Sequence, residues 1–167
     1  EDKVTVLVEE LQKIYSKMYP KITNNKDCTS IINDAQFERL NGLLDDARSH
    51  GANITPLTAE PINKTERKMP LTVLTDVNDD MKVMQQEIFG PIIPIITYKN
   101  TAEAIHYINK NDRPLALYIY SFDKAFQQEI LLNTHAGGVC INEATFHVAN
   151  DDLPFGGIGA SGMGQYH

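Results

Sequence analysis

The sequence predicts an α/β fold, a largely parallel sheet flanked by helices. Between residues 29 and 142, segments with apolar side chains at helical spacing alternate with short β-branched and apolar runs. This alternation is typical of folds in which helices cover a parallel sheet. The chain has 167 residues, of which 42% are apolar, as in a globular protein. We therefore expect residues 1–167 to form a single domain.

The first predicted helix lies at the start of the chain and ends before Pro20. Its apolar residues recur at intervals of three and four, which places them on one helix face. They are Val4, Leu7, Val8, Leu11, Ile14, Tyr15 and Met18.

A second helix is predicted after Asn33, a residue that suits the N-cap position. Gln36, three residues later, is the reciprocal half of a capping box. The apolar stripe of this helix consists of Phe37, Leu40, Leu44 and Ala47. Gly51 suits the left-handed conformation that follows many helices.

The middle of the chain predicts a loop and two strands. Residues 53–69 are polar and contain two prolines, which indicates a loop with at most one short strand. Leu71–Leu74 and Ile92–Tyr98 are the two strands. Because Pro94 lacks a backbone donor, we expect the second strand to be bulged or to lie at an edge.

The second half of the chain predicts two helices and two strands. Asn100 caps a helix whose buried residues are Ala104, Ile105 and Ile108. Leu115–Tyr120 is almost continuously apolar, which predicts a strand covered on both faces. Asp123 begins a further helix that ends at Gly137, and Val139–Asn142 is the last strand.

The composition excludes several classes of protein. Fifteen Lys and Arg against 22 Asp and Glu give a formal charge of −7, which argues against nucleic acid as a partner. No apolar run approaches the ~20 residues that cross a bilayer, so we expect no membrane partner. Two cysteines make no disulfide framework and favour the reducing cytoplasm. Because the chain begins without Met and stops after a glycine cluster, we expect it to be part of a longer protein.

Two glycine-rich motifs have the letters of a known site without its context. Gly157, Gly159 and Gly162 match G-x-G-x-x-G, but no strand precedes them and no helical pattern follows, as a dinucleotide site requires. Ser161 lies among them but lacks the second glycine of a nucleophile elbow. The five histidines show no metal-ligand spacing, so no metal site is predicted.

Neither cysteine is predicted to be catalytic. Cys140 lies in a predicted strand, where a free cysteine packs as a small apolar side chain. A reactive thiolate needs a helix N-terminus or a nearby cation, and the local sequence supplies neither. Cys28 lies in a polar stretch, which predicts a loop. We expect His147, Asp151 and Asp152 to lie in a solvated loop rather than to form a site.

Glu87 and Phe89 form a more informative pair, ahead of the Gly90-Pro91 turn. In an extended stretch, residues two apart point to the same side. A carboxylate can accept hydrogen bonds from both hydroxyls of a sugar diol, while an aromatic ring contacts a flat heterocycle. From this pentapeptide alone, the plainer interpretation of a surface Glu beside a core Phe is favoured.

Two longer segments, Met84–Pro91 and Leu153–Gly164, resemble signature segments of the aldehyde dehydrogenase superfamily. Pro114–Tyr118 and Gly137–Val139 are similar to the class 3 branch of this family. His147–Gly157 is similar to the same run in members that oxidise coniferyl aldehyde. The resemblance extends in order over nearly the whole chain.

The resemblance implies the catalytic-domain part of that fold and NAD(P)-dependent oxidation of an aldehyde to a carboxylic acid. It implies that Glu87 holds the nicotinamide ribose, that Phe89 flanks ribose and nicotinamide, and that Phe155 lines the aldehyde channel. The nucleophilic cysteine, the general-base glutamate and the dinucleotide-binding half of the family align upstream of Glu1. We therefore assign no catalytic residue, expect NAD or NADP to bind only the longer protein, and expect this chain alone to be inactive.

The class 3 branch also implies a homodimer, for which Val139–Asn142 is a plausible interface edge, while a tetramer stays open. An alternative from another class is a non-catalytic oligomerisation or binding module that reuses this half of the fold. A reductase of activated acyl groups is a third, weaker option. The sequence leaves open which aldehyde is used and whether the cofactor is NAD or NADP.

Overall fold

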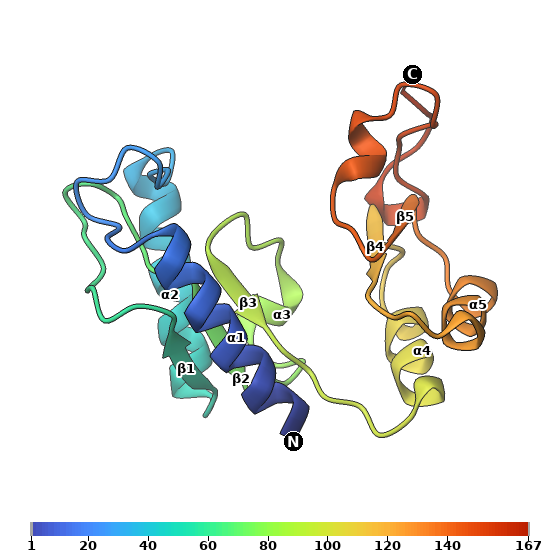
Figure 1. The fold of residues 1–167 in the computed structure, drawn as a ribbon, viewed down its shortest axis with the longest axis horizontal. Helices are drawn as coiled ribbons and strands as arrows, with labels where there is room; N and C mark the ends of the chain where they lie inside the picture. Colours follow the sequence, from blue (N-terminus) through green and yellow to red (C-terminus); the bar gives the residue numbers. More distant parts are fainter. Residues whose placement is uncertain (1, 167) are drawn as a thin grey trace. The chain divides into compact units, whose positions relative to one another are not determined.

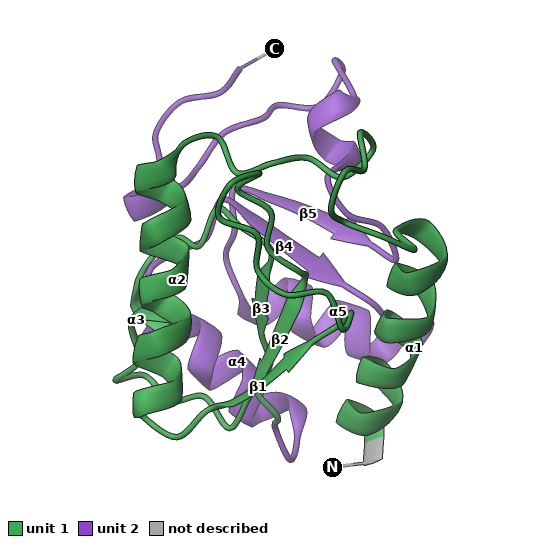
Figure 2. Ribbon diagram, turned by 90° about the vertical axis from the view of Figure 1, so that its left-hand side faces the viewer, with its two compact units in different colours: residues 1–97 green, residues 98–167 purple. Residues whose placement is uncertain are grey.

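The computed structural model describes residues 2–166, and the chain divides into two compact units, Glu1–Thr97 and Tyr98–His167 (Figures 1 and 2). Each unit combines helices with a small sheet that contains a parallel strand pair. The predicted α/β class is therefore confirmed. The single domain over residues 1–167 stays a prediction.

Over residues 2–97, unit 1 carries three helices and one sheet. The helices are α1 (Asp2–Met18), α2 (Asp34–Ser49) and α3 (Lys82–Gln85), and the strands are β1 (Asn53–Pro56), β2 (Thr72–Thr75) and β3 (Ile92–Pro94). The strand order is β1-β2-β3, with β1 antiparallel and β3 parallel to β2. Pro94 lies in an edge strand, as predicted, and this strand ends there rather than at Tyr98. The short helix α3 was not predicted.

Helix α2 supplies much of the core of unit 1. The side chain of Asn33 accepts a hydrogen bond from the Gln36 amide at 2.9 Å, so the predicted N-cap is confirmed. The predicted stripe is buried, together with Leu43, and its members Leu40, Leu44 and Ala47 share a core cluster with Leu74 of β2 and Ile92 of β3. Gly51 has a φ of 91°, a conformation that other residues rarely adopt.

Helix α1 spans the predicted residues, but its apolar face is only half covered. Val4, Val8, Leu11 and Tyr15 are half-buried. Leu7, Ile14 and Met18, on the same predicted face, remain exposed. The helical period was therefore correct, whereas the depth of burial depends on what packs against the helix.

Polar contacts fix the loop that follows α1. The Glu60 carboxylate accepts hydrogen bonds from the Thr23 amide at 3.1 Å and the Ile22 amide at 2.8 Å. These donors hold the pKa of Glu60 below its usual value, because they favour the ionised form. The buried Lys68 ammonium donates to the carbonyls of Ile22, at 2.8 Å, and Asn25, at 2.6 Å. The burial of this charge is thus compensated by backbone acceptors.

Over residues 98–166, unit 2 contains two helices, two strands and two short 3₁₀ turns. They are α4 (Thr101–Lys110), β4 (Ala116–Ile119), α5 (Lys124–Asn133), β5 (Gly138–Ile141), η1 (Phe146–Ala149) and η2 (Gly159–Ser161). Strands β4 and β5 are parallel. Asn100 and Asp123 cap α4 and α5 through their side chains, as predicted. Helix α5 ends at Asn133, before the predicted Gly137.

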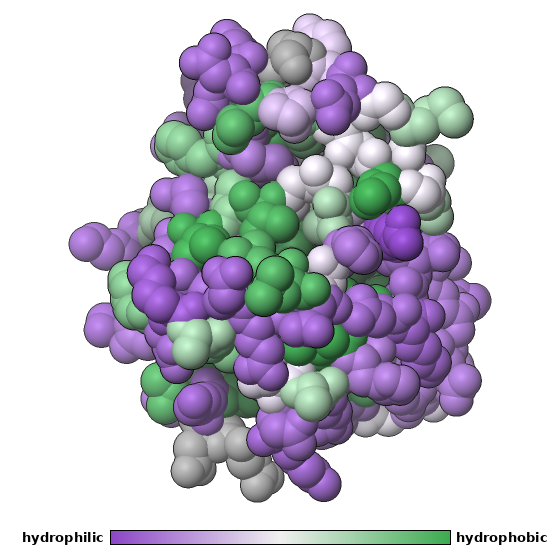
Figure 3. Space-filling view, turned by 90° about the vertical axis from the view of Figure 1, so that its right-hand side faces the viewer, coloured by the Kyte–Doolittle hydropathy of each residue, from purple (hydrophilic) through white to green (hydrophobic). Residues whose placement is uncertain are grey.

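The predicted burial in unit 2 is wrong in two elements. Only Ile119 is buried in β4, which was expected to be covered on both faces, and no residue of α4 is fully buried. A sheet of two strands offers little surface to pack against, so apolar side chains lie at the surface among polar ones (Figure 3). Within residues 2–166 we find no helix with the length and apolar content needed to cross a bilayer.

Candidate functional site

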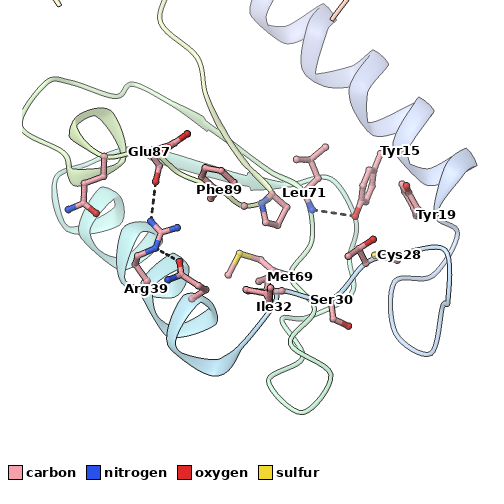
Figure 4. Close-up of a pocket in the computed structure, with 16 residues that line it drawn as sticks. Tyr15, Tyr19, Cys28, Ser30, Ile32, Arg39, Met69, Leu71, Glu87 and Phe89 are labelled. Carbon is pink, nitrogen blue, oxygen red and sulfur yellow. Dashed lines mark hydrogen bonds between the residues drawn. The ribbon is translucent and has the colours of Figure 1, made fainter. Parts of the chain in front are cut away.

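The two predicted cofactor residues, Glu87 and Phe89, line one groove in unit 1 (Figure 4). The groove has a volume of about 960 Å³, which is within the ~300–1,000 Å³ range of small-molecule sites. Most of its wall is apolar or aromatic. The side chains that build it include Tyr15, Tyr19, Cys28, Ile31, Ile32, Gln36, Arg39, Met69, Leu71, Gln86, Glu87, Phe89 and Pro91.

The segment that carries Glu87 and Phe89 has an unusual backbone. Phe89 has a φ of 45°, a left-handed conformation that costs a bulky residue on the order of 1–3 kcal/mol. The residue is 81% exposed, so the interpretation of Phe89 as a core residue is wrong. At the next position, a Cβ on Gly90 would lie 2.5 Å from both methyl carbons of Leu40. A larger residue at this position would require the Leu40 side chain to move.

The Glu87 carboxylate is available to a ligand. Glu87 is exposed, and among the described residues no hydrogen bond to its carboxylate is found. Its backbone carbonyl, by contrast, accepts from Arg39 Nη1 at 3.2 Å, as Figure 4 shows. A free carboxylate can accept from two vicinal hydroxyls, and an exposed ring two residues away can contact a flat heterocycle. The pair therefore presents an acceptor for a sugar diol and an exposed ring for a flat heterocycle on the wall of one groove.

Two tyrosines and a cysteine form the other end of the groove. The Tyr15 hydroxyl accepts from the Leu71 amide at 3.4 Å, and the rings of Tyr15 and Tyr19 are 5.2 Å apart. Burial raises the pKa of Tyr15, and the neighbouring Cys28 adds to the shift. Cys28 lies in a loop, as predicted, and is half-buried. Nothing local in the sequence indicates that these residues share a groove.

Phe155, the predicted channel residue, belongs to unit 2. It is half-buried and forms an isolated antiparallel bridge with Tyr166, with backbone hydrogen bonds of 3.0 and 2.7 Å. Its ring lies 5.7 Å from that of His147, centroid to centroid, at a tilt of 58°. The irregular tail predicted for Asp151–Gly164 is thus held at one end by a specific backbone pairing.

Cys140 has a close partner that the sequence did not predict. Its Sγ lies 3.2 Å from Nδ1 of His147, and both side chains are buried. The expectation that His147 lies in a solvated loop is therefore wrong, although Asp151 and Asp152 are exposed as expected. The chain turns at Thr145, in a left-handed conformation with φ of 64°, and returns over β5.

The surroundings of His147 are tightly packed. A Cβ on Gly138 would lie 2.6 Å from its ring, and the Tyr118 ring lies 6.0 Å away. Its Nε2 is buried and has no hydrogen-bond partner among the described residues. Over residues 2–166, no group of three or more His, Cys, Asp or Glu could hold a metal ion.

The comparisons with known proteins agree with the sequence motifs. The sequence matches the Aldehyde dehydrogenase family over residues 1–167. It is 50% identical, over 165 residues, to a probable coniferyl aldehyde dehydrogenase of Pseudomonas aeruginosa, covering 99% of this chain and 34% of that protein. It is 37% identical, over 163 residues, to a dimeric NADP-preferring aldehyde dehydrogenase of Rattus norvegicus, covering 96% of this chain and 34% of that protein.

A solved structure, the substrate-bound state of Staphylococcus aureus AldH, has a TM-score of 0.85 and 39% sequence identity. The match covers 99% of this chain and 34% of that one. The chain thus spans about a third of the length of the relatives it matches. Because the family match extends over all 167 residues, the chain belongs to the aldehyde dehydrogenase family.

Proposed function

We propose that the protein containing this chain oxidises an aldehyde, of the coniferyl-type aromatic class, to a carboxylic acid with NAD or NADP. The observation that supports this most directly is the exposed pair of Glu87 and Phe89 at one groove. The names of the relatives from Pseudomonas aeruginosa and Rattus norvegicus support the aromatic aldehyde and the nicotinamide cofactor, respectively.

In this proposal, the residues of unit 1 bind and orient the cofactor. The Glu87 carboxylate accepts hydrogen bonds from the two hydroxyls of the nicotinamide ribose, and the Phe89 ring packs beside ribose and nicotinamide. Bound there, NAD or NADP would supply the hydride acceptor for the oxidation. The contribution of this chain is to fix the position of the nicotinamide.

The direct test is the complete protein with NAD, NADP and a panel of aromatic and aliphatic aldehydes, followed by nicotinamide absorbance. We expect reduction of one or both cofactors with aromatic aldehydes. If no aldehyde supports reduction, the alternative of a non-catalytic module is favoured.

Phe155→Ala tests the substrate side of the proposal. If the ring lines the channel, an aromatic aldehyde loses a stacking contact worth ~0.5–1.5 kcal/mol, whereas a small aliphatic aldehyde loses little. We expect the ratio of kcat/KM for cinnamaldehyde over acetaldehyde to fall roughly two- to tenfold. Phe122→Ala, at a residue that is 91% exposed, is the control. An unchanged ratio, with an equal loss toward both aldehydes, would make Phe155 an anchor of the loop through its contact with His147.

We also propose that residues 1–167 alone do not oxidise aldehydes. Cys140 is buried, and its Sγ lies 3.2 Å from Nδ1 of His147, so the access of an aldehyde to the thiol is limited. We expect no cofactor reduction when the isolated chain is incubated with the same aldehydes. Turnover that disappears in Cys140→Ser would instead identify Cys140 as a nucleophile.

The assembly and compartment are further parts of the proposal. The name of the rat relative describes a dimer, which supports a homodimer for the complete protein. We propose the reducing cytoplasm as its compartment, because two cysteines make no disulfide framework.

A further inference from the structure

We propose that Arg39 is a positioning residue for the nicotinamide cofactor. It holds the backbone that presents Glu87 and Phe89 to the groove. This inference rests on the proposed function, because it assigns to Arg39 a role that acts through those two residues.

Arg39 reaches from helix α2 to two successive carbonyl groups (Figure 4). Its Nη1 donates to the Glu87 carbonyl at 3.2 Å, and its Nη2 donates to the Ile88 carbonyl. Its Nε donates to Oε1 of Gln36, one turn earlier in the same helix, at 2.7 Å. Since every nitrogen of the guanidinium has an acceptor, the planar fork is fixed in direction. The Gln36 side chain therefore accepts a hydrogen bond from Arg39 rather than completing the predicted capping box.

These hydrogen bonds lie directly before Phe89, whose backbone conformation is unfavourable. Phe89 is in the left-handed region, which is unfavourable for an aromatic residue and persists only where neighbours hold it. Arg39 holds the two carbonyls before Phe89. On the other side, Gly90 packs on Leu40, the residue that follows Arg39 in α2. One turn of α2 therefore holds both sides of the Phe89 backbone.

The first test measures the backbone without any cofactor. In the complete protein, Arg39→Ala should raise hydrogen–deuterium exchange of the amides in residues 84–92 by about tenfold, because the local opening is no longer opposed. Arg48→Ala is the matched control, since Arg48 lies on the same helix and pairs with Asp45 at the surface. It should leave that exchange unchanged. Arg39→Lys should restore part of the protection, because one ammonium can reach only one of the carbonyls.

The second test measures the affinity for the reduced cofactor by fluorescence titration. We expect Arg39→Ala to raise the Kd about tenfold, equal to 1.4 kcal/mol. In the Glu87→Gln background the same change should raise Kd less than about threefold, because Arg39 acts through Glu87 and Phe89. An equal, additive loss in both backgrounds would mean that Arg39 does not act through Glu87 and would overturn the proposal.

The outcomes separate this inference from the proposed function. Wild-type protein that binds no nicotinamide cofactor would overturn the proposed function and, with it, the cofactor role of Arg39. Wild-type binding with unchanged exchange and unchanged affinity in Arg39→Ala would overturn the role of Arg39 alone. If Arg39→Ala does not fold, Arg39→Lys carries both measurements, with intermediate effects expected.

Discussion

Glu87→Gln should lower the kcat/KM for the cofactor about 10- to 100-fold in the complete protein. The amide keeps the size of the side chain but loses the charge that strengthens two hydrogen bonds to the ribose, each worth ~1.5–3 kcal/mol at most. A decade in rate corresponds to ~1.4 kcal/mol, so this range requires the loss of about one to two such contributions. Because Glu87 is exposed and its carboxylate has no partner among the described residues, the folded protein should tolerate the change.

Single-turnover measurement of reduced cofactor separates this effect from binding of the aldehyde. We expect its formation to slow in Glu87→Gln, and the melting temperature to stay within about 2 °C, as for most surface substitutions. Glu9→Gln makes the same chemical change at an exposed residue of α1 and should leave both quantities unchanged. If instead Glu87→Gln lowers only the melting temperature, Glu87 has a structural role.

Helices α2, α4 and α5 could be predicted because their signals are local, whereas the short α3 has no side-chain cap to mark it. Asn33, Asn100 and Asp123 each accept hydrogen bonds from amides two or three residues later, so capping depends only on adjacent sequence. The strands could be located from β-branched and apolar runs in the same way. How deeply they are buried could not, because burial depends on distant segments. Strand β4 was expected to be covered on both faces, yet only Ile119 is buried.

The candidate site shows the same division. Glu87 and Phe89 both line the groove, but not through the extended backbone that their spacing assumed, because Phe89 has a φ of 45°. Arg39 could not be assigned, because it contacts Glu87 across 48 residues of sequence. The contact of Cys140 with His147 spans only seven residues, but it requires the left-handed turn at Thr145, a conformation that a threonine rarely adopts.

The structure gives a packing reason for glycines in the tail, where the G-x-G-x-x-G match lies. A Cβ on Gly157 would lie 2.1 Å from the carbonyl oxygen of Ser161, and one on Gly156 would lie 2.3 Å from that of Gly164. These two glycines therefore allow separate stretches of the tail's backbone to approach each other closely. The Ser161 hydroxyl closes the same turn, since it accepts from the Ile158 amide at 2.9 Å. The proposed channel residue, Phe155, begins this segment.

Gly157→Ala should open this segment at a cost of about 3 kcal/mol or more. Inserting a methyl group into a packed region costs ~1–3 kcal/mol, and the upper end applies here because the obstacle is backbone, which cannot rotate away. We expect exchange of the Phe155 amide, which bonds to the Tyr166 carbonyl at 3.0 Å, to accelerate by about 100-fold. Gly42→Ala is the matched control, because no atom lies within 4 Å of its added Cβ on helix α2. It should stabilise the chain by about 0.5–1 kcal/mol, the advantage of alanine in a helix. Unchanged exchange at Phe155 in Gly157→Ala would show that the close approach of this backbone does not hold the segment in place.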